Sequence, residues 1–373
     1  MLNTSLLFFE PIMSRFLTAA LLLGQTFAYD TVLGFNSRPL VETRTIEEIY
    51  NAALKEGGTV TVWHGGDEKD QQDSLKSAFE ERFPGMTLNI TVDLSKYLDG
   101  EIDQQLYNNN VFVDSIILQT LQDFPRWQQE GALLNYAPVG FDKVYSAFKD
   151  SISASWYGYS IFFWSISWNT AKLPNVKNIS SYSDLLKPEF KNKLVLTYPN
   201  DDDAVLFAFY QIMQQLGTKW FDDLLKQNPR WVRGTATPLT IVSEANYSRS
   251  ATFTSFGGFN PEKNVNISFP NDAEFVTWPQ TAAILKDAPH PESAKLFHNF
   301  LLSSDHQKTV PLSVRKDINS SESPYQNIMN TPHTNPTTFA RFMSDRVTVE
   351  RLRFYFENRL GSAQGLSPLI DNI

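Results

Sequence analysis

The spacing of the apolar residues changes repeatedly along the chain, and each change predicts a new element of secondary structure. Thr45-Ile46-Glu47-Glu48 forms a capping box that begins an amphipathic helix, and Gly57-Gly58 ends this helix. Apolar runs of strand type predict strands at 59–63, 86–92 and 113–118. Stretches with one apolar helical face predict a helix at 68–83 and another that begins after Gln119-Thr120 and extends through Trp127.

The second half of the chain repeats the pattern after one long apolar run. Residues 161–168, IFFWSISW, carry no charge and predict a buried strand. The elements that follow are a strand at 193–197 and helices near 183–186 and at 204–215, 219–226, 294–302 and 347–360. Strand–loop–helix units in this order predict an α/β fold, with a mostly parallel sheet covered by helices on both faces. Since no flexible linker separates the halves, we expect two lobes between which the chain crosses more than once.

Composition agrees with an ordered protein that has two hydrophobic cores. The chain has 373 residues, of which 42% are hydrophobic and 13% aromatic. The formal net charge is −9, and no long run of basic residues is present. A nucleic-acid partner needs a basic face, and so does docking on an anionic membrane, so we expect neither.

The first 28 residues have the pattern of a secretory signal peptide. Arg15 precedes the apolar run FLTAALLL at 16–23, and Thr26-Phe27-Ala28 offers small residues for a signal peptidase. Eight apolar residues are too few to span a bilayer, so no stable membrane insertion is expected. Because Glu10 interrupts the segment before this run, Met13 is an alternative start. These features predict a secreted, extracellular protein.

Five glycosylation sequons follow the signal segment, and the chain has no cysteine. Sequons behind a signal peptide favour a glycosylated secreted protein. A secreted chain without disulfides depends on large cores, and it has no thiol for catalysis, metal binding or redox chemistry. The predicted acceptors are Asn89, Asn178, Asn246, Asn266 and Asn319.

Four segments resemble the extracellular solute-binding proteins of ABC-type importers, in the ferric iron, thiamine and phosphonate group with the type II periplasmic-binding fold. They cover about residues 45–310, and the likeness is strongest to secreted fungal members described as Fe3+ transport-like. The segments are VTVWHGGDEKDQQDSLKSAFEERFPG, VDSIILQTLQDFPRWQQEGALLNY, SYSDLLKPEFKNKLVLTYPNDDDA and WPQTAAILKDAPHPESAKLFHNFLLSSDHQ.

This resemblance implies a two-lobe α/β fold with an interlobe cleft, which closes on a small molecule by hinge bending. We also expect a monomer that needs no cofactor. We expect lobe 1 to comprise residues 29–160 plus 275–330 and lobe 2 to comprise 165–270. Residues 331–373 are expected to form a C-terminal helical segment that packs on the lobes.

The resemblance also implies which loops face the cleft. Ligands of open α/β sheets bind beyond the carboxyl ends of the strands, and several loops of this chain follow such ends. Glycines in the first loop would let backbone N–H groups approach a ligand, although a tight strand–helix turn explains them equally well. An aromatic wall could also include Trp63, although most aromatic residues of such a chain are core. The candidate ligand-binding residues are His64, Gly65, Gly66, Asp67, Gln119, Thr120, Trp164, Tyr198, Asn200, Asp201, Asp202, Phe256, Gly257 and Trp278.

The residue types leave the metal and the chemistry open. Family members that hold ferric iron through side chains use a Tyr-Tyr pair in the second lobe, where this chain has ATFTSFGGFN. Aspartates could supply the oxygen ligands that ferric iron prefers, so the metal stays unknown. No G-x-S-x-G, H-E-x-x-H or phosphate-binding glycine motif occurs, which favours a binding protein over an enzyme. The alternatives are a secreted enzyme on the same scaffold, or a protein that contacts a host or cell wall without binding a small ligand.

Three consecutive aspartates, 201–203, precede the predicted helix 204–215. One of them can cap the helix and a second can interact with its dipole, but a third adds repulsion. No Lys or Arg lies within several residues of them in the sequence. A carboxylate about 4 Å from an anionic ligand costs roughly 4 kcal/mol at an effective dielectric constant near 20. We therefore predict a cationic or neutral ligand, with a helix cap on a solvated rim as the alternative.

Overall fold

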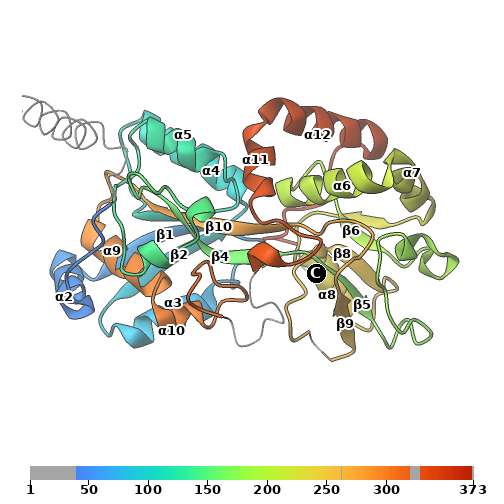
Figure 1. The fold of residues 1–373 in the computed structure, drawn as a ribbon, viewed down its shortest axis with the longest axis horizontal. Helices are drawn as coiled ribbons and strands as arrows, with labels where there is room; N and C mark the ends of the chain where they lie inside the picture. The colour runs from blue at the N-terminus through green and yellow to red at the C-terminus, as the bar shows by residue number, and fades with distance from the viewer. Residues whose placement is uncertain (1–38, 262, 320–327, 372–373) are drawn as a thin grey trace, which may run out of the picture.

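Two lobes lie side by side along the long axis of the molecule in the computed structural model (Figure 1), which describes residues 39–261, 263–319 and 328–371. The predicted signal peptide at 1–28 lies outside the described residues. Within the described ranges, no helix combines the length and the apolar character that crossing a membrane would require.

The first lobe is built on a five-stranded sheet in the order β2-β1-β3-β10-β4. β1 runs parallel to β2 and β3, whereas β10 runs antiparallel to β3 and β4. The prediction of a mostly parallel arrangement was therefore wrong for β10, which returns from the second lobe. The strands are β1 (Thr59–Gly65), β2 (Thr87–Asp93), β3 (Ser115–Leu118), β4 (Tyr157–Phe163) and β10 (Thr277–Ile284).

Helices cover both faces of this sheet, as the sequence predicts. Successive strand residues point to opposite faces, so Ile117 packs in one core and Ile116 and Leu118 pack in another. The capping box of α2 is confirmed, because the Glu48 N–H donates to the Thr45 Oγ1 (3.2 Å) and the Thr45 N–H donates to the Glu48 Oε2 (2.7 Å). The helices of this lobe are α2 (Ile46–Glu56), α3 (Asp73–Arg82), α4 (Ser95–Tyr107), α5 (Asp123–Gln129), α9 (Pro291–Leu301) and α10 (Ser304–Gln307).

The apolar run 161–168 is not one strand. It divides at Trp164 into the end of β4, which pairs with β10, and β5 (Ser165–Asn169), which pairs with β8 and β9 of the second lobe. The chain therefore passes from one lobe to the other at Trp164. It returns between β9 and β10.

The second lobe contains two smaller sheets. β5 lies between β8 and β9 in an antiparallel sheet, and β6 pairs with β7 in parallel. The C-terminal helices α11 and α12 pack against α6 in this lobe (Figure 1). The elements are β6 (Val195–Thr197), β7 (Arg230–Val232), β8 (Ala251–Ser255), β9 (Val265–Ser268), α6 (Asp203–Leu216), α7 (Thr218–Lys226), α8 (Thr237–Ser243), α11 (Thr338–Ser344) and α12 (Arg346–Leu360).

Short 3-10 turns complete the described secondary structure, and one of them replaces the helix predicted near 183–186. They are Phe141–Lys143, Ser146–Phe148, Asp184–Leu186, Pro188–Phe190 and Ile328–Asn330. The exact lobe boundaries predicted from the sequence stay a prediction.

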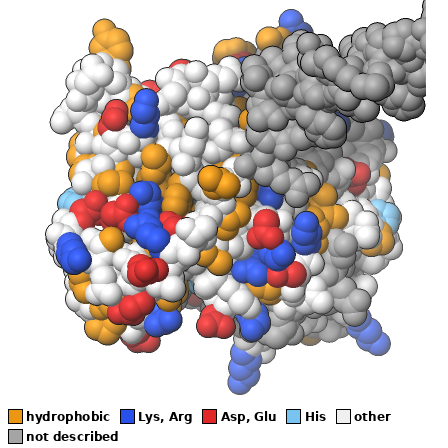
Figure 2. All heavy atoms as spheres, turned by 60° about the vertical axis from the view of Figure 1, so that its left-hand side comes forward, with side chains coloured by type: hydrophobic (Ala, Val, Ile, Leu, Met, Phe, Trp, Pro, Cys, Tyr) orange, Lys and Arg blue, Asp and Glu red, His pale blue; other side chains and the backbone are white. Residues whose placement is uncertain are grey.

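The surface carries charges of both signs. Figure 2 shows Lys and Arg side chains interspersed with Asp and Glu on the face drawn. All five predicted glycosylation acceptors have exposed side chains: Asn89, Asn178, Asn246, Asn266 and Asn319. Ser320 and Ser321, which complete the last sequon, lie outside the described residues. Glycan attachment stays a prediction.

Candidate functional site

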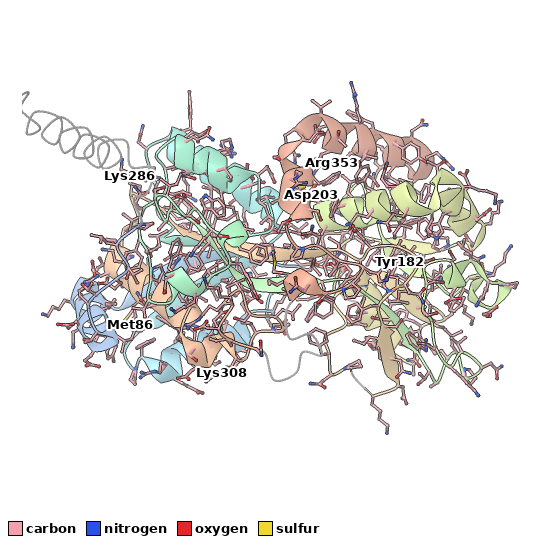
Figure 3. All side chains as sticks on the ribbon, in the orientation of Figure 1. Met86, Tyr182, Asp203, Lys286, Lys308 and Arg353 are labelled. Carbon is pink, nitrogen blue, oxygen red and sulfur yellow. The ribbon has the colours of Figure 1, made fainter. Side chains whose placement is uncertain are left out.

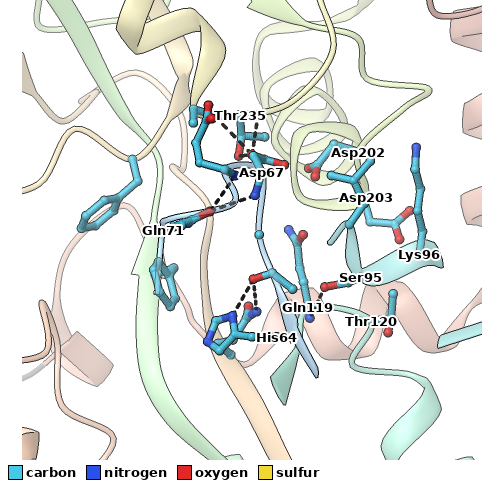
Figure 4. A pocket seen from close by; sticks show the side chains of 18 of the residues that line it. His64, Asp67, Gln71, Ser95, Lys96, Gln119, Thr120, Asp202, Asp203 and Thr235 are labelled. Carbon is cyan, nitrogen blue, oxygen red and sulfur yellow. Dashed lines mark hydrogen bonds between the residues drawn. The ribbon is translucent and has the colours of Figure 1, made fainter. Parts of the chain in front are cut away.

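A cavity of about 300 Å³ lies between the two lobes, at the carboxyl ends of β1, β2 and β3 and opposite the start of α6 (Figure 4). The first lobe contributes the loop after β1, the start of α4 and the loop after β3. The second lobe contributes the aspartate triplet and the loop after β7. The lining residues predicted from the sequence are His64, Gly65, Gly66, Asp67, Gln119, Thr120, Trp164, Asp201, Asp202, Phe256 and Trp278.

The other three predicted residues do not line this cavity. The Tyr198 ring is buried against Trp231, with ring centroids 5.9 Å apart. The Asn200 Nδ2 donates to the Gly361 carbonyl (3.1 Å), beyond the end of α12. Gly257 packs against β5, where a Cβ would lie 2.6 Å from the Ser165 Oγ.

The glycines of the first loop are required by packing. A Cβ on Gly65 would lie 2.0 Å from the Ser95 Oγ, and a Cβ on Gly66 would lie 2.5 Å from the Gln71 Oε1. The N–H groups are already engaged, because Gly66 donates to the Asp93 carbonyl (3.0 Å) and Asp67 donates to the Gln71 Oε1 (2.8 Å). These two N–H groups therefore pair within the protein, as a tight strand–helix turn requires, and contact of this loop with a ligand stays a prediction.

His64 is a buried, neutral support for this loop. Its Nδ1 lies 2.8 Å from the Gly65 carbonyl and its Nε2 lies 3.0 Å from the Tyr159 hydroxyl. A carbonyl only accepts, so Nδ1 carries the proton and Nε2 accepts from Tyr159. Burial lowers the pKa of His64 to about 4, which outweighs the contact with the Gly65 carbonyl. His64 therefore adds no charge to the cavity at neutral pH.

Asp67 reaches across the cleft into the second lobe. Its Oδ2 accepts hydrogen bonds from the Thr235 N–H (2.7 Å), the Thr235 hydroxyl (2.5 Å) and the Ala236 N–H (3.2 Å). Figure 4 shows Asp67 and Thr235 facing each other at one end of the cavity. A carboxylate that accepts three donors is strongly held, so Asp67 links the two lobes directly.

Asp201 forms a second link between the lobes. Lys96 of α4 donates to its Oδ1 (2.6 Å), and the Arg233 Nε donates to its Oδ2 (2.9 Å). Arg233 also donates to the Tyr97 hydroxyl of the first lobe (2.8 Å). Burial acts to raise the pKa of Asp201, but the contacts with Arg233 and Lys96 outweigh burial and hold this pKa below its usual range.

The other two aspartates have separate roles at the start of α6. Asp202 is the N-cap, and its Oδ1 accepts from the Val205 N–H (2.9 Å). Burial, together with the charge of Asp67, raises the pKa of Asp202 to about 7. Asp203 is the first helical residue and pairs with Arg353 of α12, and the two side chains meet in Figure 3.

The triplet is thus compensated by Lys96, Arg233 and Arg353, although no basic residue lies near it in the sequence. Our assumption that its charge is not offset was wrong. The charge around the cavity nevertheless remains negative, because six carboxyl residues line it, whereas Lys96 is the only Lys or Arg among the described residues of the lining. The carboxyl residues are Asp67, Glu68, Asp70, Asp201, Asp202 and Asp203.

Four aromatic rings form one wall of the cavity. Trp164 and Trp278 meet edge to face with centroids 4.8 Å apart, and Phe162 stacks on Trp278 at 5.9 Å. Phe256 lies 5.7 Å from Phe162. Trp63 is not part of this wall, because its ring packs with Phe112 in the core under α4.

Several lining residues were not identified from the sequence. Leu94, Ser95 and Lys96 directly follow β2, and Thr235 and Ala236 lie shortly after β7, so the rule that applies to the carboxyl ends of strands could have found them. Phe162 and Gln280 lie within strands, and no signal in the sequence separates them from core residues. The lining residues that were not among the predicted ligand-binding residues are Glu68, Asp70, Gln71, Leu94, Ser95, Lys96, Phe162, Asp203, Thr235, Ala236 and Gln280.

The carboxylates of the cavity are spread around its wall. In the part of the chain that the structure describes, no group of three or more His, Asp or Glu residues is arranged to hold a metal ion.

The sequence profile of the bacterial extracellular solute-binding proteins matches residues 115–330, more than half of the chain. The chain belongs to this family. Its members are binding proteins, in agreement with the prediction that the protein is not an enzyme. No curated protein sequence matches the chain.

Solved structures share the fold at low sequence identity. A binding protein from Actinobacillus pleuropneumoniae with bound fructose 6-phosphate is 18% identical, has a TM-score of 0.64, and the match covers 82% of this chain and 99% of that chain. Iron-bound HitA from Pseudomonas aeruginosa is 15% identical with a TM-score of 0.56, covering 79% and 99%. A putative spermidine/putrescine transporter protein from Listeria monocytogenes is 17% identical with a TM-score of 0.56, covering 81% and 99%. The predicted two-lobe periplasmic-binding fold is confirmed.

Proposed function

We propose that this solute-binding protein captures a small cationic or neutral molecule in the cavity between its lobes. The observation that carries this proposal is the composition of the lining, which contains six carboxyl residues, four aromatic rings and one lysine. The Lys96 ammonium is itself held by Asp201 at 2.6 Å, so an anionic ligand would find no unpaired cation in this lining. An ammonium or another organic cation is favoured by the carboxylates and by the faces of the rings.

The two raised pKa values support a cationic ligand. Burial and the charge of Asp67 raise the pKa of Asp202 to about 7, and burial, together with Asp371, Asp67 and Asp70, raises that of Glu68 to about 7. A buried carboxyl group keeps its proton near neutral pH when no cation is close enough to balance its negative charge. A bound cation can take the place of these protons.

Closure of the lobes is the second part of the proposal. The chain crosses between the lobes at Trp164, again between β9 and β10, and a third time between α10 and α11, and the first two connections are short enough to act as hinges. Asp67, Lys96 and Tyr97 of the first lobe contact Thr235, Asp201 and Arg233 of the second across the cavity. We infer that this arrangement is the closed one and that a ligand enters when these contacts open.

The third part of the proposal is that the protein is secreted, glycosylated and monomeric, with no cofactor and no nucleic-acid partner. The support is the signal segment at 1–28, the five exposed acceptor asparagines and the negative net charge. Enzymatic deglycosylation of the protein from culture medium should lower its mass on a gel, and light scattering should give the mass of one chain. A protein that remains in the cells, or a dimer mass, would contradict this part.

A thermal-shift screen tests the binding function. The panel contains amines, thiamine-like cations, metal ions, sugars, phosphate and phosphonates. A specific ligand at about 100 times its dissociation constant should stabilise the protein by roughly 2.7 kcal/mol. A result in which only phosphate or phosphonates stabilise the protein would contradict the cationic or neutral ligand, and no stabilisation by any class would contradict the binding function.

Asp202→Asn is the variant that tests the site. Asn still caps a helix, so α6 should remain folded while the negative charge is lost. Asp201 is less suitable, because Asp201→Asn would also disturb Lys96 and Arg233. Asp202→Asn should weaken a cationic ligand about tenfold or more, whereas Asp305→Asn, at an exposed residue of α10, should change nothing. Equal affinity in both variants would show that the triplet serves only α6 and the cavity rim.

A further inference from the structure

The indole N–H of Trp164 is a buried donor that faces no acceptor. Trp164 is 5% exposed, lines the cavity, and its Nε1 has no hydrogen-bond partner among the described residues. The neighbouring indole differs, because the Trp278 Nε1 donates to the Gln280 Oε1 (3.2 Å). Buried polar groups are nearly always paired, and this one belongs to a residue that lines the cavity, so we take the ligand as the source of its partner.

Gln119 adds a second free polar group to the cavity. Its backbone N–H donates to the Ser95 Oγ (2.9 Å), which fixes the loop after β3. Its side-chain Nε2 is buried without a partner within the described chain. Figure 4 shows the Gln119 side chain extending from this loop toward the side of the cavity where Asp202 lies. An amide Nε2 only donates, so the free atom of Gln119, like the Trp164 N–H, favours an acceptor atom of the ligand.

An indole N–H only donates, so it selects for an acceptor. The carboxyl residues select for a positive charge. A simple diamine satisfies the carboxylates but presents only donors to Trp164. A carboxylate would satisfy Trp164, but it would enter a lining with six carboxyl residues. An uncharged oxygen satisfies the N–H without this repulsion.

We propose, resting on the proposed function, that the ligand is an amine that also carries an uncharged hydrogen-bond acceptor, such as a hydroxyl or an amide oxygen. The ammonium lies toward Asp202 and the other carboxylates, and the acceptor oxygen accepts the Trp164 N–H. Trp164 is then a residue that determines specificity, at the point where the chain crosses between the lobes.

The test compares ligands of equal chain length. The probes are n-alkylamines, α,ω-diaminoalkanes, amino alcohols, ω-amino acid amides and ω-amino acids with three to six carbons, titrated calorimetrically at pH 8. Amino alcohols or amino amides should bind about 5- to 100-fold more tightly than the alkylamine of the same length, because they offer the Trp164 N–H an acceptor and the alkylamine does not. This comparison needs no variant protein.

Matched variants then assign the preference to one atom. Trp164→Phe keeps a ring but removes the N–H, so the preference of amino alcohols and amino amides over alkylamines should fall to about one, and the weaker cation–π face of Phe should lower the affinity of all the amines by a common factor. Trp168→Phe is the control, because the Trp168 Nε1 is also buried without a partner in the described residues but lies outside the cavity lining. Asp202→Asn should weaken all the amines alike and leave the preference intact.

The outcomes separate this inference from the proposed function. If amines bind without any preference for an acceptor, or if the preference survives Trp164→Phe, this inference is wrong and the proposed function stands. If amino acids bind more tightly than amino amides, the uncharged acceptor is wrong. If no amine binds while a bare anion does, both proposals are wrong.

Discussion

Asp202 should make the stability of the protein depend on pH in a way that one substitution removes. This carboxyl group caps α6 through the Val205 N–H, and its pKa is raised to about 7 by burial and by the charge of Asp67. The charged groups that act on it come from several elements: Asp67 in the loop after β1, Asp203 in α6, Lys96 in α4 and Arg353 in α12. The free energy of unfolding should therefore change as Asp202 titrates.

The sign follows from the protons that each state binds. The ordinary pKa of an aspartate is 3.8, so between about pH 4 and pH 7 the folded protein holds a proton on Asp202 that the unfolded chain has lost. The stabilising contribution of this proton is present at low pH and is lost as the pH rises through the folded-state pKa. From pH 5 to pH 8 the loss is about 2 to 3 kcal/mol in the free energy of unfolding.

Urea denaturation of the wild type and of Asp202→Asn at pH 5, 6, 7 and 8 measures how much Asp202 contributes to the pH dependence of the free energy of unfolding. The difference between the two proteins cancels groups that titrate in both, including Glu68, whose pKa is also raised to about 7. Wild type should lose about 2 to 3 kcal/mol relative to Asp202→Asn over this range. For the control Asp305→Asn, at an exposed position, the difference in the free energy of unfolding from the wild type should not change with pH. If the stability of the wild type relative to Asp202→Asn does not change with pH, or increases with pH, the reasoning is refuted.

Three further predictions concern the first-lobe loop. Gly65→Ala places a Cβ 2.0 Å from the Ser95 Oγ, so urea denaturation should show a loss of about 1–3 kcal/mol in the free energy of unfolding. Adding Ser95→Ala to the same chain removes the clashing oxygen and should recover part of this loss. Absence of any recovery would locate the strain elsewhere. Asp67→Ala removes three hydrogen bonds between the lobes, so small-angle X-ray scattering should give a larger radius of gyration, and an unchanged radius would show that Asp67 does not hold the lobes together. His64 should stay neutral from pH 5 to 8 in NMR titrations, since burial lowers its pKa to about 4, and a midpoint above pH 6 would contradict its buried environment.

Local patterns determined many of the elements. The Thr45 capping box, the strand after Gly58 and the helix after the aspartate triplet depend on residues within a few positions of one another, so their pattern is visible in the sequence. The rule that sites lie at the carboxyl ends of strands placed the 64–67 and 119–120 loops at the cavity. α4 was missed because its sequence, SKYLDGEIDQQLY, carries few apolar residues and a weak helical stripe.

Strand pairing was decided only by the tertiary structure. The run IFFWSISW contains no breaker, and both of its halves have the composition of a buried strand. Its division at Trp164 arises because one half pairs with β10 and the other with β8 and β9. These partners lie far away in the sequence, and backbone pairing leaves little trace in the composition of a fully buried strand.

The sequence by itself determined the α/β class, the position of the cleft loops and the acidic triplet that borders the cavity. Only the tertiary structure decided how this triplet is compensated, because Lys96 lies 105 residues from Asp201, and Arg353 lies 150 residues from Asp203. Electrostatic energy depends on distance in space, so residues far apart in the sequence can dominate it. The two buried indoles also differ only in three dimensions. Trp164 and Trp168 lie in the same apolar run, and only the packing of distant segments places Trp164 in the cavity wall.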